Sequence, residues 1–152
     1  MRLSQILDKS SIIAELEVSD KKGTIDALAQ AAAGVTRASR EEIAAVLLER
    51  EQLGSTGIGG GIAIPHGKLD QVDDITIGIA LSRTGVSYDS LDDKPVHIFF
   101  LLLTPENSAG GHLRVLAQIS KLLKAEDFKK QLLSSGSAED IYETILERDE
   151  EF

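Results

Sequence analysis

A histidine closes a glycine-rich segment, Gly54–Lys68, which reads GSTGIGGGIAIPHGK. Imidazole titrates near neutral pH and can act as a nucleophile. Pro65 fixes its own φ angle and restricts the residue before it, so the apolar run Ile62–Ile64 is predicted to be a short strand that ends at His66. Gly67 has no Cβ and is expected to let larger groups approach the ring. The segment therefore predicts an imidazole presented at a strand terminus.

The loop before this strand is a candidate site for an anion. Backbone N–H groups in a glycine-rich turn suit an incoming anion, and a phosphoryl group fits both the donors and the imidazole. The residues predicted to hold it are Ser55, Thr56, Gly57 and Gly67. The loop is neither a P-loop nor a dinucleotide fingerprint, because Leu69 and Ile62 stand where those motifs need other residues, and a strand follows where they have a helix. A flexible connection without function is the alternative interpretation.

An arginine is predicted to point at this loop. Ser39 and Glu42 form a capping box that begins a helix, and its apolar stripe contains Ile43, Val46 and Leu47. Continuing the stripe by one turn reaches Arg50, at the end of the helix that leads into the glycine loop. We therefore expect the guanidinium of Arg50 to lean toward the loop.

Two further histidines have different expected roles. His112 follows Ala-Gly-Gly and is predicted to open a helix over residues 112–124. A helix N-terminus disfavours protonation, so a neutral imidazole that donates one hydrogen bond is expected, with a simple capping role as the alternative. The residues expected on the inward face of this helix are Leu113, Leu116, Ala117, Ser120 and Leu123. His97 lies inside an apolar strand and is expected to be structural.

Composition excludes several classes of function. The chain has 152 residues, the size of one domain, with 42% apolar and 27% charged residues. Its formal net charge of −9 argues against binding to nucleic acid or anionic membranes and favours basic partner surfaces. The absence of cysteine excludes disulfides and thiol catalysis. No histidine pair has metal-ligand spacing, so we expect no metal and no cofactor. No signal peptide or apolar span is recognisable, so a cytoplasmic protein without membrane insertion is expected.

The order of elements predicts an α/β sandwich, a sheet covered by helices. A helix is expected at residues 24–33, ended by Gly34. Strands are expected at residues 11–16, 75–81 and 96–103. Helices return at residues 127–133 and after Ser137, and the acidic end at residues 147–152 is predicted to be frayed.

These residues resemble a known family. The segments ERE at 49–51, GSTGIG at 54–59 and GIAIPHGK at 61–68 are similar to the enzyme IIA domains of the bacterial phosphoenolpyruvate-dependent phosphotransferase system, fructose/mannitol class. The sequence around His66 is most similar to the nitrogen-regulatory branch, except that Gly60 stands where that branch commonly has Asn. TPE at 104–106 and GHL at 111–113 fall where the family has its second active-site histidine. The resemblance runs over essentially the whole chain, so residues 1–152 are expected to form one IIA domain.

The resemblance implies a fold, a reaction and partners. The fold is a mixed sheet sandwiched between helices. His66 would accept a phosphoryl group through Nε2 from a phosphohistidine on a small histidine-containing phosphocarrier protein, with Arg50 and His112 as supporting residues. Such a protein is a phosphotransferase component, and whether it counts as an enzyme in its own right stays open. The role of Lys68, beside the histidine, also stays open.

Three hypotheses follow. The favoured one is a regulator of the nitrogen type, because no attached IIB domain is recognisable, and its further partners would be regulatory target proteins. The second is a sugar-specific IIA that relays phosphate to a separate IIB. The third is a non-catalytic module that binds an anion in the same pocket and is never phosphorylated.

Overall fold

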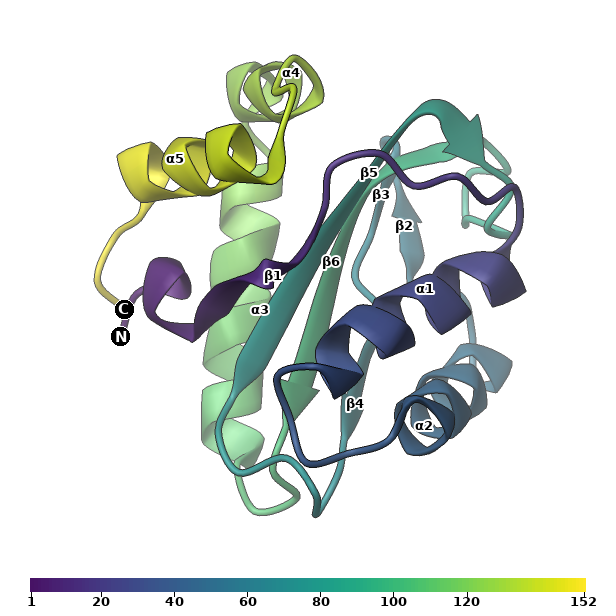
Figure 1. The fold of residues 1–152 in the computed structure, drawn as a ribbon. Helices are drawn as coiled ribbons and strands as arrows, with labels where there is room; N and C mark the ends of the chain where they lie inside the picture. The colour runs from purple at the N-terminus through teal and green to yellow at the C-terminus, as the bar shows by residue number, and fades with distance from the viewer.

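The computed structural model describes residues 1–152 and contains a sheet of six strands between two groups of helices (Figure 1). The strands are β1 (Leu7–Ile13), β2 (Gly57–Gly59), β3 (Ile62–Ala63), β4 (His66–Lys68), β5 (Thr76–Val86) and β6 (Val96–Thr104). The helices are α1 (Lys21–Ala33), α2 (Arg40–Gln52), α3 (Ala109–Leu123), α4 (Glu126–Leu133) and α5 (Ala138–Arg148), preceded by a short 3-10 helix, η1 (Leu3–Ile6). The predicted mixed α/β sandwich is confirmed.

Strand β6 is the centre of the sheet and is buried on both faces. Ile98, Phe100 and Leu102 belong to the core that contains α3, α4 and α5. Their neighbours in sequence, Phe99 and Leu101, face the core under α1 and α2. This alternation gives the continuous apolar run expected of a central strand covered by helices on both sides. The predicted strand at residues 96–103 is therefore confirmed.

The sheet is mixed, and its irregular edge carries the candidate histidine. The strand order is β1-β5-β6-β3-β2, with β5 antiparallel to β6 and both β3 and β4 parallel to it. The prediction that the apolar strand ends at His66 was wrong, because β3 stops at Ala63 and His66 begins β4. Pro65 has no N–H and interrupts the ladder, while its carbonyl accepts from Leu102 N at 3.0 Å and lets pairing resume.

The glycine-rich segment forms the hairpin between β2 and β3. Gly59, Gly60 and Gly61 have φ angles of 96°, 69° and 80°, a backbone conformation that glycine adopts without steric cost. Much of the glycine content of this segment is therefore explained by the turn itself.

The predicted helix ends agree with the structure where a side chain caps the helix. Ser39 Oγ accepts from Glu42 N at 3.1 Å and Ser39 N donates to Glu42 Oε1 at 2.9 Å, which confirms the capping box of α2. Ser137 caps α5 by accepting from Asp140 N at 3.1 Å. Helix α1 begins three residues before the predicted start at Thr24, because Asp20 accepts from Gly23 N at 2.8 Å.

The prediction for α3 was wrong in two respects. The helix begins at Ala109 and not at His112, so the two glycines lie in its first turn. Its buried face also differs from the prediction except at Leu123, and Leu113 is 66% exposed. The buried residues are His112, Val115, Gln118, Ile119, Leu122 and Leu123. The helix carries two overlapping apolar stripes, and the one with Val115 and Ile119 packs on the sheet.

The ends of the chain are tied together, so the predicted frayed C-terminus was wrong. The Asp149 carboxylate accepts from Leu3 N at 2.9 Å and from Ser4 N at 2.8 Å, and Phe152 N donates to Met1 O at 2.8 Å. The first N–H groups of a helix lack internal partners, and here the carboxylate supplies one for η1. Figure 1 shows the two termini side by side.

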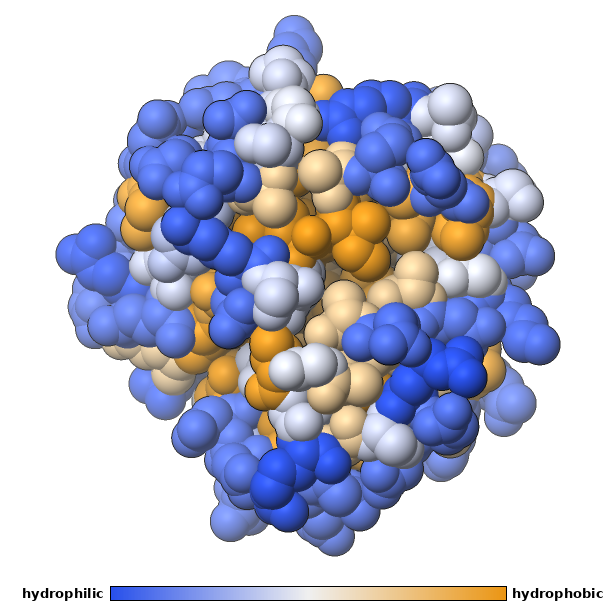
Figure 2. Space-filling view, viewed as in Figure 1, coloured by the Kyte–Doolittle hydropathy of each residue, from blue (hydrophilic) through white to orange (hydrophobic).

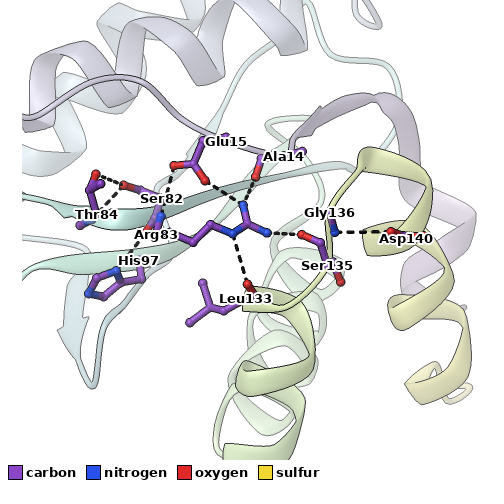
Figure 3. Close-up of polar contacts among 11 residues, drawn as sticks. Ala14, Glu15, Ser82, Arg83, Thr84, His97, Leu133, Ser135, Gly136 and Asp140 are labelled. Atoms are coloured by element: carbon purple, nitrogen blue, oxygen red, sulfur yellow. Dashed lines mark hydrogen bonds and ion pairs between the residues drawn. The ribbon is translucent and has the colours of Figure 1, made fainter.

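An arginine of β5 joins β1 to the end of α4 (Figure 3). The Arg83 guanidinium donates to the carbonyl oxygens of Ala14, Leu133 and Ser135 and forms an ion pair with Glu15. Nearby, His97 Nδ1 lies 2.8 Å from Ser82 O, which agrees with the structural role expected for this histidine.

The visible surface is mostly polar (Figure 2). Apolar residues appear mainly in the furrow between the two groups of helices, where the edge strand β1 crosses this face in Figure 1. No helix combines the length and the apolar character needed to cross a membrane.

Candidate active site

The backbone just before His66 holds its ring in one tautomer. Nδ1 of His66 lies 2.8 Å from the carbonyl oxygen of Ile64. A carbonyl oxygen only accepts hydrogen bonds, so we assign the proton to Nδ1. In the neutral ring Nε2 then carries the lone pair, which is the form that a nucleophile needs.

The surroundings also favour the neutral ring. Burial lowers the pKa of His66 below its ordinary value, and the positive charge of Arg50 acts in the same direction. The hydrogen bond to Ile64 and the charge of Glu51 oppose this shift in the pKa without cancelling it. His66 is therefore a neutral imidazole at pH 7.

The second histidine of the site lies against the first. The ring centroids of His66 and His112 are 5.4 Å apart, and the rings meet edge to face at 64°. Burial lowers the pKa of His112 to about 4, with further lowering from the protonated form of His66 and from the positive charge of Lys68. The neutral state that the sequence predicted for His112 is supported. The main cause of its lowered pKa is burial, however, and not the helix N-terminus that was expected. His112 N donates to Ser108 O at 2.8 Å as part of α3.

Arg50 extends from the last turn of α2 toward the glycine-rich segment, as predicted. Its Nη1 atom donates to the carbonyl oxygen of Gly54 at 3.0 Å. This contact links the guanidinium to the first residue of the loop and orients it at the mouth of the site.

The loop residues Ser55, Thr56 and Gly57 lie behind the site and do not line its cavity. Thr56 N donates to Glu51 Oε1 at 3.1 Å, and Gly57 N donates to Ser55 Oγ at 3.1 Å. These N–H groups stabilise the shape of the loop in this conformation, so their predicted contact with a phosphoryl group stays a prediction.

Gly67 lines the cavity, and its missing side chain serves a purpose that the sequence did not predict. A Cβ atom at Gly67 would lie 2.4 Å from Cγ1 of Val46 in α2. The glycine therefore makes room for helix α2, whereas its expected role in letting larger groups approach the ring stays a prediction.

A buried polar network that sequence reasoning missed supports the loop from behind. Glu51 accepts hydrogen bonds from the N–H and the hydroxyl of Thr56 and forms an ion pair with Lys21 at 2.9 Å. Tyr88 OH lies 3.2 Å from Thr56 Oγ1, and because the Thr56 proton goes to Glu51, Tyr88 is the donor of this bond. Burial raises the pKa of Tyr88, which keeps its hydroxyl protonated. Thr56 was predicted in a different role and Glu51 lies next to Arg50 in sequence, whereas nothing in the sequence marked Lys21 or Tyr88.

The site opens into a cavity of about 550 Å³ with a charged floor and an apolar rim. It brings together Arg50, His66, Gly67 and His112 from the predicted set, and Lys68, whose role was left open, also lines it. Leu53 and Leu113 stand at its rim and are 84% and 66% exposed. The other residues that line it are Val46, Glu49, Glu106 and Leu116. Two neutral histidines and two cations thus share this open hollow with the carboxylates of Glu49 and Glu106.

Comparison with known proteins identifies the family of this chain. The family described as "Phosphoenolpyruvate-dependent sugar phosphotransferase system, EIIA 2" matches residues 5–148. The chain belongs to this family. It is thus an EIIA domain, as the resemblance predicted.

The relatives of this EIIA domain fall into two groups. A nitrogen regulatory protein of Bradyrhizobium diazoefficiens is 37% identical over 145 residues, which cover 95% of this chain and 95% of the relative. A fructose-specific EIIA component of Haloferax volcanii is 34% identical over 146 residues, again with 95% of each chain covered. The crystal structure of nitrogen regulatory protein IIA-Ntr from Neisseria meningitidis superimposes with a TM-score of 0.88 at 34% identity, covering 93% of this chain and 97% of that one.

Proposed function

We propose that this EIIA domain accepts a phosphoryl group on Nε2 of His66 from a phosphohistidine of a small phosphocarrier protein. The observation that carries the proposal is the hydrogen bond from His66 Nδ1 to the carbonyl of Ile64, at 2.8 Å. It leaves the lone pair on the ring nitrogen away from the backbone. Arg50, Lys68 and His112 line the same cavity and are the groups that meet the phosphoryl charge.

The bonds and protons of the proposed transfer balance without a metal ion or a general base. Nε2 of His66 forms a bond to phosphorus as the bond from phosphorus to the donor's ring nitrogen breaks, and that electron pair returns to the donor ring. A donor that carries a proton on its other ring nitrogen leaves as neutral imidazole. His66 becomes a phosphorylated imidazolium, and the Ile64 carbonyl stabilises its Nδ1–H. Charge on the equatorial phosphoryl oxygens in the loose transition state is met by positioned donors.

The rim of the cavity supports a protein as the donor. Leu53, just after the last residue of α2, and Leu113, in α3, are exposed and apolar, and both line the cavity that contains the histidines. Exposed apolar side chains around a polar centre are typical of a surface that a partner covers. The net charge of −9 favours a carrier with a basic face.

The regulatory role is part of the proposal, and the comparisons support it without excluding a sugar-specific role. A relative named nitrogen regulatory protein has 37% identity, and the fructose-specific EIIA component has 34%, so the sugar-specific relay to a separate IIB is the second candidate. We favour the nitrogen-type regulator, acting as one domain over residues 1–152 in the cytoplasm on regulatory target proteins.

The test is the intact mass of the protein after incubation with phosphoenolpyruvate and the general phosphotransferase components. The proposal predicts a gain of one phosphoryl group that is lost in acid, and no gain in His66→Ala with an unchanged circular dichroism spectrum. His97→Ala is the matched control and should be phosphorylated normally. A phosphorylated His66→Ala protein would overturn the site, and an unmodified wild-type protein would favour the anion-binding module.

A further inference from the structure

A buried hydroxyl lies directly behind the second histidine. Thr104 is the last residue of β6 and is completely buried. Its Oγ1 atom lies 2.7 Å from Nδ1 of His112. Thr104 also pairs with Lys68 of β4, so it stands where the two parallel strands that carry the site end.

The direction of this hydrogen bond follows from the partners present. The hydroxyl proton of Thr104 needs an acceptor, and His112 Nδ1 is the only partner that the side chain has. A proton on Nδ1 would leave the threonine hydroxyl buried without an acceptor, which is costly. Thr104 therefore donates to Nδ1. The neutral ring of His112 must then carry its own proton on Nε2.

We propose that Thr104 is a positioning residue that fixes His112 as an Nε2–H donor toward the phosphoryl group, in the tautomer opposite to that of His66. A carbonyl at Nδ1 of His66 leaves a lone pair at Nε2, and a hydroxyl at Nδ1 of His112 leaves a proton at Nε2. One ring is thus prepared to attack phosphorus and the other to donate to its oxygens. The catalytic part of this inference rests on the proposed function, whereas the tautomer does not.

The geometry gives the proton of His112 no competing use. No protein group accepts a hydrogen bond from its Nε2 atom, and the ring lines the cavity beside His66. The neutral ring of His112 carries one N–H proton, so it can donate a hydrogen bond without any proton transfer. A donor oriented before the substrate arrives needs no reorganisation during the reaction.

The first test reads the tautomer without any phosphorylation. Ring ¹⁵N chemical shifts of the unphosphorylated wild-type protein at pH 7 should show His66 protonated at Nδ1 and His112 protonated at Nε2. Thr104→Val, which keeps the shape and removes the hydroxyl, should shift His112 toward a mixture of tautomers. Thr104→Ser should restore the wild-type pattern. A wild-type His112 protonated at Nδ1 would overturn the proposal.

The second test is single-turnover transfer from the phosphorylated carrier. Thr104→Val should be about tenfold slower, equivalent to about 1.4 kcal/mol of transition-state stabilisation, with Thr104→Ser close to wild type. In a His112→Ala background the same change should have no further effect, since Thr104 acts through that ring. Thr144→Val is the matched control, because Thr144 is also buried but donates to Asp140 O in α5.

The outcomes separate the two proposals. Wild-type rates in Thr104→Val would refute the positioning role, and an equal loss in the His112→Ala background would show that Thr104 acts by another route. A wild-type protein that takes no phosphoryl group refutes the proposed function, and the ¹⁵N shifts alone then decide the tautomer. A dispersed amide spectrum of Thr104→Val shows that the variant is folded.

Discussion

The side chain of Arg50 reaches toward the C-terminal end of its helix, where Nη1 donates to the carbonyl oxygen of Gly54, four residues later, at 3.0 Å. The contact uses one of the five N–H donors of the guanidinium, and Arg50 lines the cavity that contains His66. The end of α2 and the start of the glycine-rich segment are in this way coupled through a single cation.

Arg50→Ala is expected to slow phosphoryl transfer more than it lowers stability. Loss of one charged donor to a developing phosphoryl charge costs about 3 kcal/mol, or roughly a hundredfold in rate. Single-turnover transfer and thermal unfolding measure the two effects. Arg40→Ala is the control, because Arg40 lies in the first turn of the same helix and outside the cavity. An unchanged rate with a large fall in Tm would show that Arg50 is structural.

His112→Ala is expected to slow transfer, and His112→Gln is expected to keep part of the rate. A neutral imidazole that donates a hydrogen bond can be replaced in part by an amide N–H. Rapid-quench measurement of both variants distinguishes the roles. Equal, severe defects would indicate chemistry that needs the ring, and wild-type rates in both would leave His112 only a structural role.

Acidification is expected to destabilise the protein through His112. Its folded-state pKa of about 4 lies below the ordinary 6.5, so between these values the unfolded chain binds more protons and stability falls as the pH is lowered. The contribution is fully present above pH 6.5 and lost below pH 4. In urea unfolding, the fall in the free energy of unfolding from pH 7 to pH 5 should be about 2 kcal/mol smaller in His112→Gln than in wild type. Parallel pH profiles would contradict the assignment.

Glu51→Gln is expected to destabilise the fold by about 3 kcal/mol, because it leaves Lys21 without its anion and Thr56 with a poorer acceptor. Urea unfolding gives the free energy. Glu41→Gln is the matched control on the same helix, and since the Glu41–Arg40 pair is exposed to solvent it should leave stability almost unchanged. Equal effects in the two variants would show that the buried network contributes no stability.

The sequence predicted those parts of the molecule whose cause is local. The capping box at Ser39, the apolar strand β6 and the direction of Arg50 each depend on residues a few positions apart. The inward face of α3 was predicted wrongly because two apolar stripes overlap in its sequence, and only packing against β6 decides between them. His66 was predicted as the nucleophile from its sequence neighbours alone.

The missed parts depend on distant residues. Glu51 meets Lys21 and Tyr88 only after α1, α2 and the segment after β5 have packed together. The loop N–H groups were predicted to face a phosphoryl group because a sequence shows which donors are present. It does not show that Glu51 already accepts the hydrogen bond from Thr56 N. Thr104 likewise becomes a partner of His112 only through the turn between β6 and α3.

The interruption of the ladder at Pro65 has a consequence for transplanting this site into another protein. The proton of the His66 ring is placed on Nδ1 by the carbonyl of Ile64, two residues earlier in the chain. This tautomer therefore depends on the tripeptide Ile64-Pro65-His66 and on the neighbouring strand β6. A histidine grafted alone onto the end of an unrelated strand would exchange freely between its two neutral forms. A designer would therefore have to move the broken strand and its neighbour as one unit.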